Sequence, residues 1–295
     1  MTARSPMKKT RIHKKVFDFV IFSNLFIACC AVLMIRFTKE LFGAPFSYAF
    51  IGFVFFSTLA SYSVHWYLTD AATEVRDRRT TWLSANKRVH FVFLIISAMG
   101  SIIFLLLEIE NFIWILPAVF LTLLYSAPKI PLPLFQKLKP HIWGKTFLLA
   151  AMWAYITAAL PLLAEQMVWQ PRHWIFLLNR FALIFAICIL FDLRDREQDK
   201  SEGIKSIVTL LKMPQVKIAF TISILLSIIC GLLLFNTLQN IWLVFILIVP
   251  AFLTYFLYTP ATHSLNDYLF YFILDGLMAL SPLLYFFTEY LSPVQ

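Results

Sequence analysis

The sequence predicts an all-α protein that is embedded in a membrane by about nine transmembrane helices. Of its 295 residues, 60% are hydrophobic and only 14% are charged, whereas soluble domains usually hold about 25% charged residues. Most of the hydrophobic runs extend for about 18–22 residues and are apolar on every side, as expected of helices in lipid. The strands of a membrane barrel would be about 10 residues long and would alternate in polarity.

Nine apolar segments follow one another along the chain, and each predicts one span. The expected spans cover residues 16–36, 44–66, 88–107, 112–127, 143–164, 173–191, 216–236, 241–258 and 267–288. We therefore expect a basic segment over residues 1–15 and a single membrane domain over residues 16–290. The first span is predicted to be uncleaved, because it is too long for a signal peptide and no cleavage site follows it.

The basic residues indicate the orientation of these spans. Twenty-one of the 25 lysines and arginines lie in residues 1–15, 67–90, 128–145 and 192–217. Cytoplasmic loops are enriched in Lys and Arg, so the N-terminus is predicted to be cytoplasmic and the C-terminus external. The net charge of +9 then indicates anionic lipid headgroups as partners, and no nucleic acid is expected.

Two acidic clusters begin at Asp70 and Asp192, which are 122 residues and four spans apart. Each cluster follows an even-numbered span at the predicted cytoplasmic face. This spacing suggests two four-helix halves that face each other, with the ninth helix as an addition. No repeat is visible in the residues themselves.

The second cluster carries the strongest chemical signal. If span six continues as a helix, Asp192, Asp195 and Asp199 share one face of it. Carboxylates crowded in this way repel one another unless a cation lies among them, and Mg²⁺ prefers such oxygen ligands together with water and phosphate. The neighbouring Arg194 and Lys205 would suit phosphate oxygens. The alternative is an ordinary charged cytoplasmic loop.

The first cluster places Asp70 and Glu74 four residues apart, at the cytoplasmic end of span two and close to His65. Two such clusters at one face suit two metal ions bridged by a diphosphate. His65 is an equally good candidate for a boundary histidine and for a metal ligand.

Asn24, Arg180 and Asp275 are lone polar residues inside predicted spans. Residues of this kind usually face the interior of a helical bundle. The structural interpretation is that Arg180 and Asp275 form an ion pair and that the Asn24 amide contributes to helix packing. The alternative is a functional role for these residues.

The pattern D-L-R-D-R-E-Q-D over residues 192–199, followed by G-I-K-S over residues 203–206, resembles the second aspartate-rich motif of the UbiA-type intramembrane prenyltransferases. The segment from Leu124 to Ser126, with Lys129 and Lys145, is similar to the loop after helix four in that family. The first family motif is degenerate in this chain, because Trp66 stands where an asparagine is expected.

This resemblance implies Mg²⁺-dependent prenyl transfer from an isoprenoid diphosphate to an acceptor in the membrane, aromatic or lipidic in kind. Asp192, Asp195 and Asp70 would be the catalytic residues. The implied metal ligands are Asp192, Asp195, Asp199, Asp70, Glu74 and His65. The implied diphosphate ligands are Tyr125, Ser126, Lys129, Lys145, Arg194 and Lys205.

Three alternatives stay open on the sequence alone. A catalytically inactive protein of the same fold that binds isoprenoid diphosphate or lipid would explain the degenerate first motif. A transporter would need paired broken helices with Gly or Pro, and the chain has only seven glycines. A CDP-alcohol phosphotransferase would need a D-G-x-x-A-R segment, which the sequence lacks.

Overall fold

The computed structural model describes residues 6–45, 47–68, 78–126 and 144–291, with the backbone alone for residues 6–11, 68 and 126. The described chain is built from helices, and it contains no strand. Within these described ranges, six helices are long and apolar enough to cross a membrane. Two bent helix pairs and one shorter apolar helix match the other three predicted spans. The predicted all-α membrane architecture is confirmed.

The first half of the chain forms α1 (Pro6–Phe22), α2 (Leu25–Phe42), α3 (Tyr48–Leu68), α4 (Arg78–Ala85), α5 (Lys87–Leu107), η1 (Ile109–Asn111) and α6 (Phe112–Ser126). The middle of the chain forms α8 (Lys145–Ala154), the π-helix η4 (Tyr155–Ala159), α9 (Leu160–Leu163), α10 (Pro171–Ser201) and α11 (Ile207–Leu210). The last part forms α12 (Met213–Leu233), α13 (Phe235–Leu238), α14 (Ile241–Phe256), α15 (Tyr258–His263), the π-helix η5 (Leu269–Leu274), α16 (Asp275–Met278) and α17 (Leu280–Leu291).

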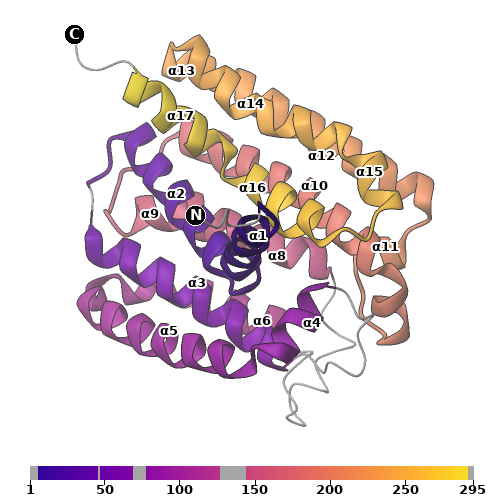
Figure 1. The fold of residues 1–295 in the computed structure, drawn as a ribbon. Helices are drawn as coiled ribbons and strands as arrows, with labels where there is room; N and C mark the ends of the chain where they lie inside the picture. The colour runs from indigo at the N-terminus through magenta and orange to yellow at the C-terminus, as the bar shows by residue number, and fades with distance from the viewer. Residues whose placement is uncertain (1–5, 46, 69–77, 127–143, 292–295) are drawn as a thin grey trace.

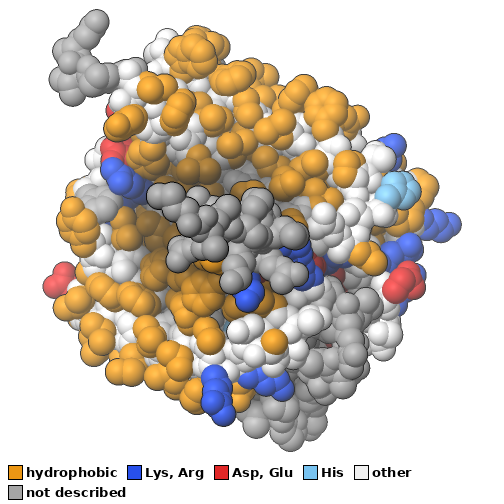
Figure 2. All heavy atoms as spheres, viewed as in Figure 1, with side chains coloured by type: hydrophobic (Ala, Val, Ile, Leu, Met, Phe, Trp, Pro, Cys, Tyr) orange, Lys and Arg blue, Asp and Glu red, His pale blue; other side chains and the backbone are white. Residues whose placement is uncertain are grey.

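The long helices form one bundle, in which α10 packs against α8 and α12 and lies between the early and late helices (Figure 1). Hydrophobic side chains cover most of the face in Figure 2, and charged side chains form only small groups on it. Many of the large apolar side chains of α5, α12 and α14 are exposed. Such a surface suits contact with lipid.

The first and ninth predicted spans are each bent, which corrects the expectation of continuous helices there. The segments Ile12–Phe22 and Leu25–Phe42 meet at 61°, and Leu269–Met278 and Leu280–Leu291 meet at 60°. Asn24 lies at the first bend with a left-handed backbone (φ 68°), a conformation that asparagine adopts more readily than most residues. The helix that contains span six is longer than the predicted span. This helix, α10, continues to Ser201 and therefore includes the second acidic cluster.

Helices α3 and α5 approach each other closely through two glycines. A Cβ atom at Gly52 would lie 2.6 Å from the ring of Phe104, and one at Gly100 would lie 2.6 Å from the ring of Phe56. The two phenylalanine rings stack on each other with centroids 5.6 Å apart. Each glycine therefore leaves the space that a phenylalanine of the facing helix occupies.

We expect Gly100→Ala to lower the stability of the protein in detergent, because overpacking a close contact costs about 1–3 kcal/mol. Gly276→Ala is the matched control, since the nearest atom to its new Cβ is 3.4 Å away, in Phe26. Thermal unfolding should show a lower midpoint for Gly100→Ala and little change for Gly276→Ala. Equal midpoints for the two variants would contradict the close contact.

Candidate functional site

A cavity of about 290 Å³ lies among α3, α6, α8, α10 and the η5–α16 segment. Lys145 lines it at the first residue of α8, and Asp199 lines it near the last residue of α10. Further along both helices the lining becomes apolar, with Leu149 and Trp153 on α8 and Ile184 on α10. The cavity therefore has a charged end at one face of the bundle and an apolar end inside it.

Lys145 joins two carboxylates of α10 at the charged end. Its ammonium nitrogen is 3.0 Å from Asp199 Oδ1 and 3.6 Å from Asp192 Oδ1. Both aspartates are 3% exposed, and Asp192 Oδ2 also accepts a hydrogen bond of 2.5 Å from the Thr146 hydroxyl. The cation that offsets the repulsion between these two carboxylates is thus a side chain of the protein itself.

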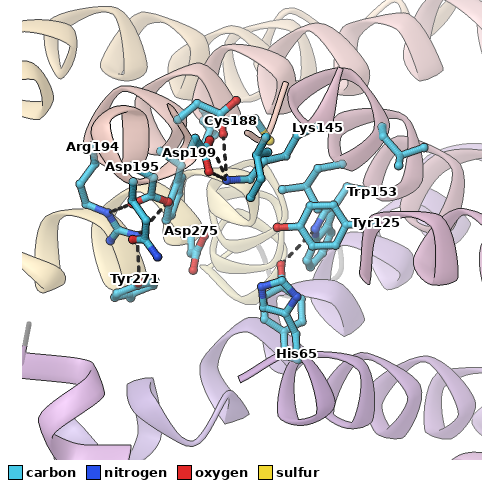
Figure 3. Close-up of a pocket in the computed structure, with 18 of the residues that line it drawn as sticks. His65, Tyr125, Lys145, Trp153, Cys188, Arg194, Asp195, Asp199, Tyr271 and Asp275 are labelled. Carbon is cyan, nitrogen blue, oxygen red and sulfur yellow. Dashed lines mark hydrogen bonds and ion pairs between the residues drawn. The ribbon is translucent and has the colours of Figure 1, made fainter. Parts of the chain in front are cut away.

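The third carboxylate of this face, Asp195, has a different basic partner. Arg194 Nε donates to Asp195 Oδ1 at 2.7 Å, and Arg194 Nη2 donates to the Tyr271 hydroxyl at 2.9 Å (Figure 3). The guanidinium also lies over the rings of Phe270 and Tyr271, 4.7 and 4.8 Å from their centroids. These contacts hold Arg194 between α10 and η5 at the edge of the cavity.

The opposite wall of the cavity is aromatic. His65 of α3 and Tyr125 of α6 stack with ring centroids 5.3 Å apart, and both line the cavity with Lys205. Trp153 Nε1 donates to the Tyr62 hydroxyl at 3.2 Å. One cavity is thus lined by five predicted site residues that come from separate segments: His65, Tyr125, Lys145, Arg194 and Lys205. Their roles stay predictions.

Asn24, Arg180 and Asp275 have separate environments. Asp275 lines the cavity, and no Arg180–Asp275 ion pair occurs in the described structure. Arg180 instead reaches the Thr157 hydroxyl at 3.5 Å and lies over the ring of Phe176. Asn24 accepts a hydrogen bond of 2.5 Å from Arg79 Nη2 at the bend before α2.

Several predicted site residues lie outside the described residues. These are Asp70, Glu74 and Lys129, together with the side chain of Ser126. The described residues contain no group of three His, Cys, Asp or Glu side chains placed to hold a metal ion. Asp192, Asp195 and Asp199 have the oxygen donors that Mg²⁺ takes, so they suit a metal that is shared with other ligands rather than one held by α10 alone.

Thr146 and Arg79 are two polar residues of the site that the sequence-based expectations do not include. Thr146 contacts Asp192, and it also accepts a hydrogen bond of 3.1 Å from the backbone N–H of Ile207. Arg79 lines the cavity with its guanidinium between the rings of Trp66 and Tyr271, 4.0 and 4.1 Å from their centroids. The position of Thr146 directly after Lys145 is the one signal in the sequence for Thr146. In the sequence, Arg79 resembles any other arginine of a basic loop.

The arrangement of the helices defines the class of protein: a polytopic membrane protein with a charged cavity that opens into an apolar interior. No protein-family model matches the sequence, and no curated protein matches it. The structure is similar to the apo structure of a UbiA homolog from Aeropyrum pernix K1, with a TM-score of 0.51 and 12% sequence identity. The similarity covers 92% of this chain and 97% of the other. The chain therefore has a UbiA-type fold.

Proposed function

We propose that this protein transfers a prenyl group from an isoprenoid diphosphate to an acceptor within the membrane. The observation that carries the proposal is the cavity, because its charged end and its apolar end are continuous. An isoprenoid diphosphate likewise has a charged end, the diphosphate, joined to an apolar chain. The UbiA-type fold supports the proposal independently.

In this proposal the basic side chains at the charged end bind the diphosphate. Lys145, Arg194 and Lys205 would donate to its oxygens, and Tyr125 would donate from the facing wall. As the bond between the prenyl carbon and the diphosphate oxygen breaks, its electron pair stays on the diphosphate. Positive groups held in place before the reaction stabilise that charge without reorganisation.

Mg²⁺ is the metal that the donor chemistry suits, and it would bind diphosphate oxygens and withdraw charge from them. Asp192, Asp195 and Asp199 would hold it together with Asp70 and Glu74, with Asp192, Asp195 and Asp70 as the catalytic carboxylates. His65 is a further candidate ligand. Lys145 would leave Asp192 and Asp199 for the diphosphate when the donor binds, before the bond to the prenyl carbon breaks.

The proposed reaction leaves an allylic cation, which water would capture if it reached the site. Trp153, Met152 and Leu149 on α8 present apolar surface along the cavity, and Trp153 is only 4% exposed. An aromatic face also attracts a cation electrostatically. These walls would protect the cation until the acceptor attacks it.

The test is a screen of the purified protein in bilayer discs with Mg²⁺, several isoprenoid diphosphates and several acceptors. The acceptors should include aromatic rings, quinone precursors, haem and lipid alcohols. We expect pyrophosphate release that Asp192→Ala and Asp195→Ala each reduce by about 100-fold or more. Glu40→Ala is the control, because Glu40 pairs with Arg36 on an exposed surface of α2. Release that survives in both aspartate variants would refute the mechanism.

One observation favours a second function, which is binding without turnover. Lys145 already pairs with both Asp192 and Asp199, so these two carboxylates have a cationic partner in the protein itself. A protein of this kind would bind an isoprenoid diphosphate or a lipid and release no pyrophosphate. Binding of the donor with no release for any acceptor would favour this reading.

A further inference from the structure

Asp275 is a carboxylate inside the bundle, apart from the groups that would bind the diphosphate and the metal. It is the first residue of α16 and directly follows the π-helix η5, and π-turns are frequent at functional sites. Asp275 is half-buried and lines the cavity, where it lies between Arg194 and Tyr125 in Figure 3. In the described structure its carboxylate makes no hydrogen bond and no ion pair. The cavity therefore offers an unpaired hydrogen-bond acceptor at this position.

The depth of Asp275 in the cavity places it where the charged end meets the apolar end. Its negative charge acts on the Cys188 thiol and on the Tyr62 hydroxyl, and both of these side chains line the cavity. Cys188 is four residues before Asp192 on α10, which corresponds to a rise of about 6 Å away from the charged end. The reacting carbon of a donor whose diphosphate binds at Lys145 would lie at this boundary.

Two arginines lie near the Asp275 carboxylate without forming an ion pair with it. The charges of Arg79 and Arg194 both attract it, and nearby cations oppose the cost of placing a carboxylate at this depth. Each guanidinium donates elsewhere, since Arg194 donates to Asp195 and Arg79 donates to Asn24. The arginines therefore offset the charge of Asp275 and leave its oxygen atoms open to a ligand in the cavity.

Tyr62 supplies a hydrogen-bond donor near this carboxylate. Its hydroxyl oxygen accepts a hydrogen bond of 3.2 Å from Trp153 Nε1, and the hydroxyl proton has no acceptor in the described structure. A hydroxyl group of a ligand is complementary to this pair, because it has a proton for Asp275 and a lone pair for Tyr62. A methyl ether has no such proton to donate. The two residues together therefore favour a ligand that carries a hydroxyl group.

We propose that Asp275 and Tyr62 bind the hydroxyl group of the acceptor, and that Asp275 takes its proton when the prenyl group is transferred. This inference rests on the proposed function, and it narrows the acceptor to phenols and alcohols. The bond between the prenyl carbon and the diphosphate breaks, and its electron pair stays on the diphosphate. A lone pair of the acceptor oxygen forms the new bond to that carbon, and the hydroxyl proton moves to the carboxylate. The products are a prenyl ether, pyrophosphate and a protonated Asp275, which then releases the proton to water.

The first experiment measures binding without turnover. An alkyl phenol with a trifluoromethyl group at the end of its chain is added to the protein in bilayer discs, and fluorine NMR gives the bound fraction relative to empty discs. We expect the phenol to bind about tenfold or more tightly than its methyl ether, the order expected for a hydrogen bond to a charged group. Asp275→Asn should remove most of this preference, and Tyr62→Phe should reduce it. Glu108→Gln is the matched control, because Glu108 is a 7% exposed carboxylate that bonds to Ser47 and Asn111 and does not line the cavity.

The second experiment follows the prenyl group through turnover with Mg²⁺, geranylgeranyl diphosphate and the same phenol. In the unsubstituted protein the ether should exceed the prenyl alcohol, which is the product of capture by water. Asp275→Asn should lower ether formation by about 100-fold or more, the order that a positioned general base contributes. Pyrophosphate release should fall less, because water captures the cation that the acceptor no longer attacks, so the prenyl alcohol should exceed the ether. A purely structural role of Asp275 would lower both products together and leave their ratio unchanged.

The two experiments separate failure of this inference from failure of the proposed function. A preference for the phenol that Asp275→Asn removes, without pyrophosphate release from any donor, would refute the transferase and support the hydroxyl site. Turnover with an unchanged product ratio in Asp275→Asn would refute the role of Asp275 alone. If Asp275→Asn does not fold, the unsubstituted protein and Tyr62→Phe decide the question. Equal binding of the phenol and its methyl ether, or an unchanged preference in Tyr62→Phe, would then overturn the inference.

Discussion

The Lys145→Met variant is expected to lose about 100-fold or more of its turnover, the order found when one preorganised charge-stabilising donor is removed. Lys145 contacts Asp192 and Asp199 at the charged end of the cavity, where the proposed leaving group develops its charge. Methionine keeps most of the volume of the side chain and removes the ammonium. The rate of pyrophosphate release in bilayer discs measures the effect.

The same substitution should also lower stability, because two carboxylates that are each 3% exposed would lose their common cation. Breaking a buried ion pair in this way costs about 3–5 kcal/mol, and the 23% exposure of the Lys145 side chain places the expected cost at or below that range. Adding Asp199→Asn should restore part of the thermal stability and none of the turnover. This double variant separates the two roles of Lys145.

Lys39→Met is the matched control for Lys145→Met. Lys39 is 1% exposed and pairs with Glu165 on the segment after α9, and neither residue lines the cavity. Its loss should lower the unfolding temperature and leave the turnover of the folded protein unchanged. Equal losses of turnover in the two variants would mean that Lys145 acts through stability alone.

The membrane fold and the carboxylate face of α10 could both be predicted from the sequence, because each depends on residues that are close together in it. Apolar runs of the length of a bilayer predict spans directly. Asp192, Asp195 and Asp199 lie three and four residues apart, so a helix that continues to Ser201 places them together whatever surrounds it. Lys145 was predicted as a site residue because of the family resemblance. Its distance in sequence from the aspartates gave no indication of this role.

The partners of these residues could not be predicted, because they come from distant segments. Thr146 reaches Asp192 across a separation of 46 residues, and Tyr62 meets Trp153 across 91. No local pattern encodes such contacts. The bend at Asn24 was missed for another reason: a buried amide that packs helices and an asparagine in a left-handed turn look the same in sequence.

Arg79 connects four separate parts of the structure, and it is the second residue whose loss should have a large effect. Its guanidinium lies between the rings of Trp66 and Tyr271 and donates to Asn24 at the first bend. Its backbone N–H donates to Asp267 Oδ2 at 3.0 Å. Arg79 is only 3% exposed, and its contacts connect α4 with α3, with the α1–α2 bend and with the segment at η5.

Arg79→Met is expected to lower the free energy of unfolding by about 2–5 kcal/mol, since it leaves a buried amide oxygen unpaired and removes two cation–π contacts. The adjacent Arg78→Met is the matched control. The Arg78 side chain is 39% exposed where it pairs with Asp18, whereas Arg79 is 3% exposed, so the loss of Arg78 should cost less than the loss of Arg79. Thermal unfolding in detergent should therefore give a much lower midpoint for Arg79→Met than for Arg78→Met.

Arg79→Lys should resemble Arg79→Met, because an ammonium replaces neither the planar stacking nor the fixed donors of the guanidinium. If Arg79→Lys instead matches the unsubstituted protein, charge alone holds α4 in place and the stacked geometry contributes nothing.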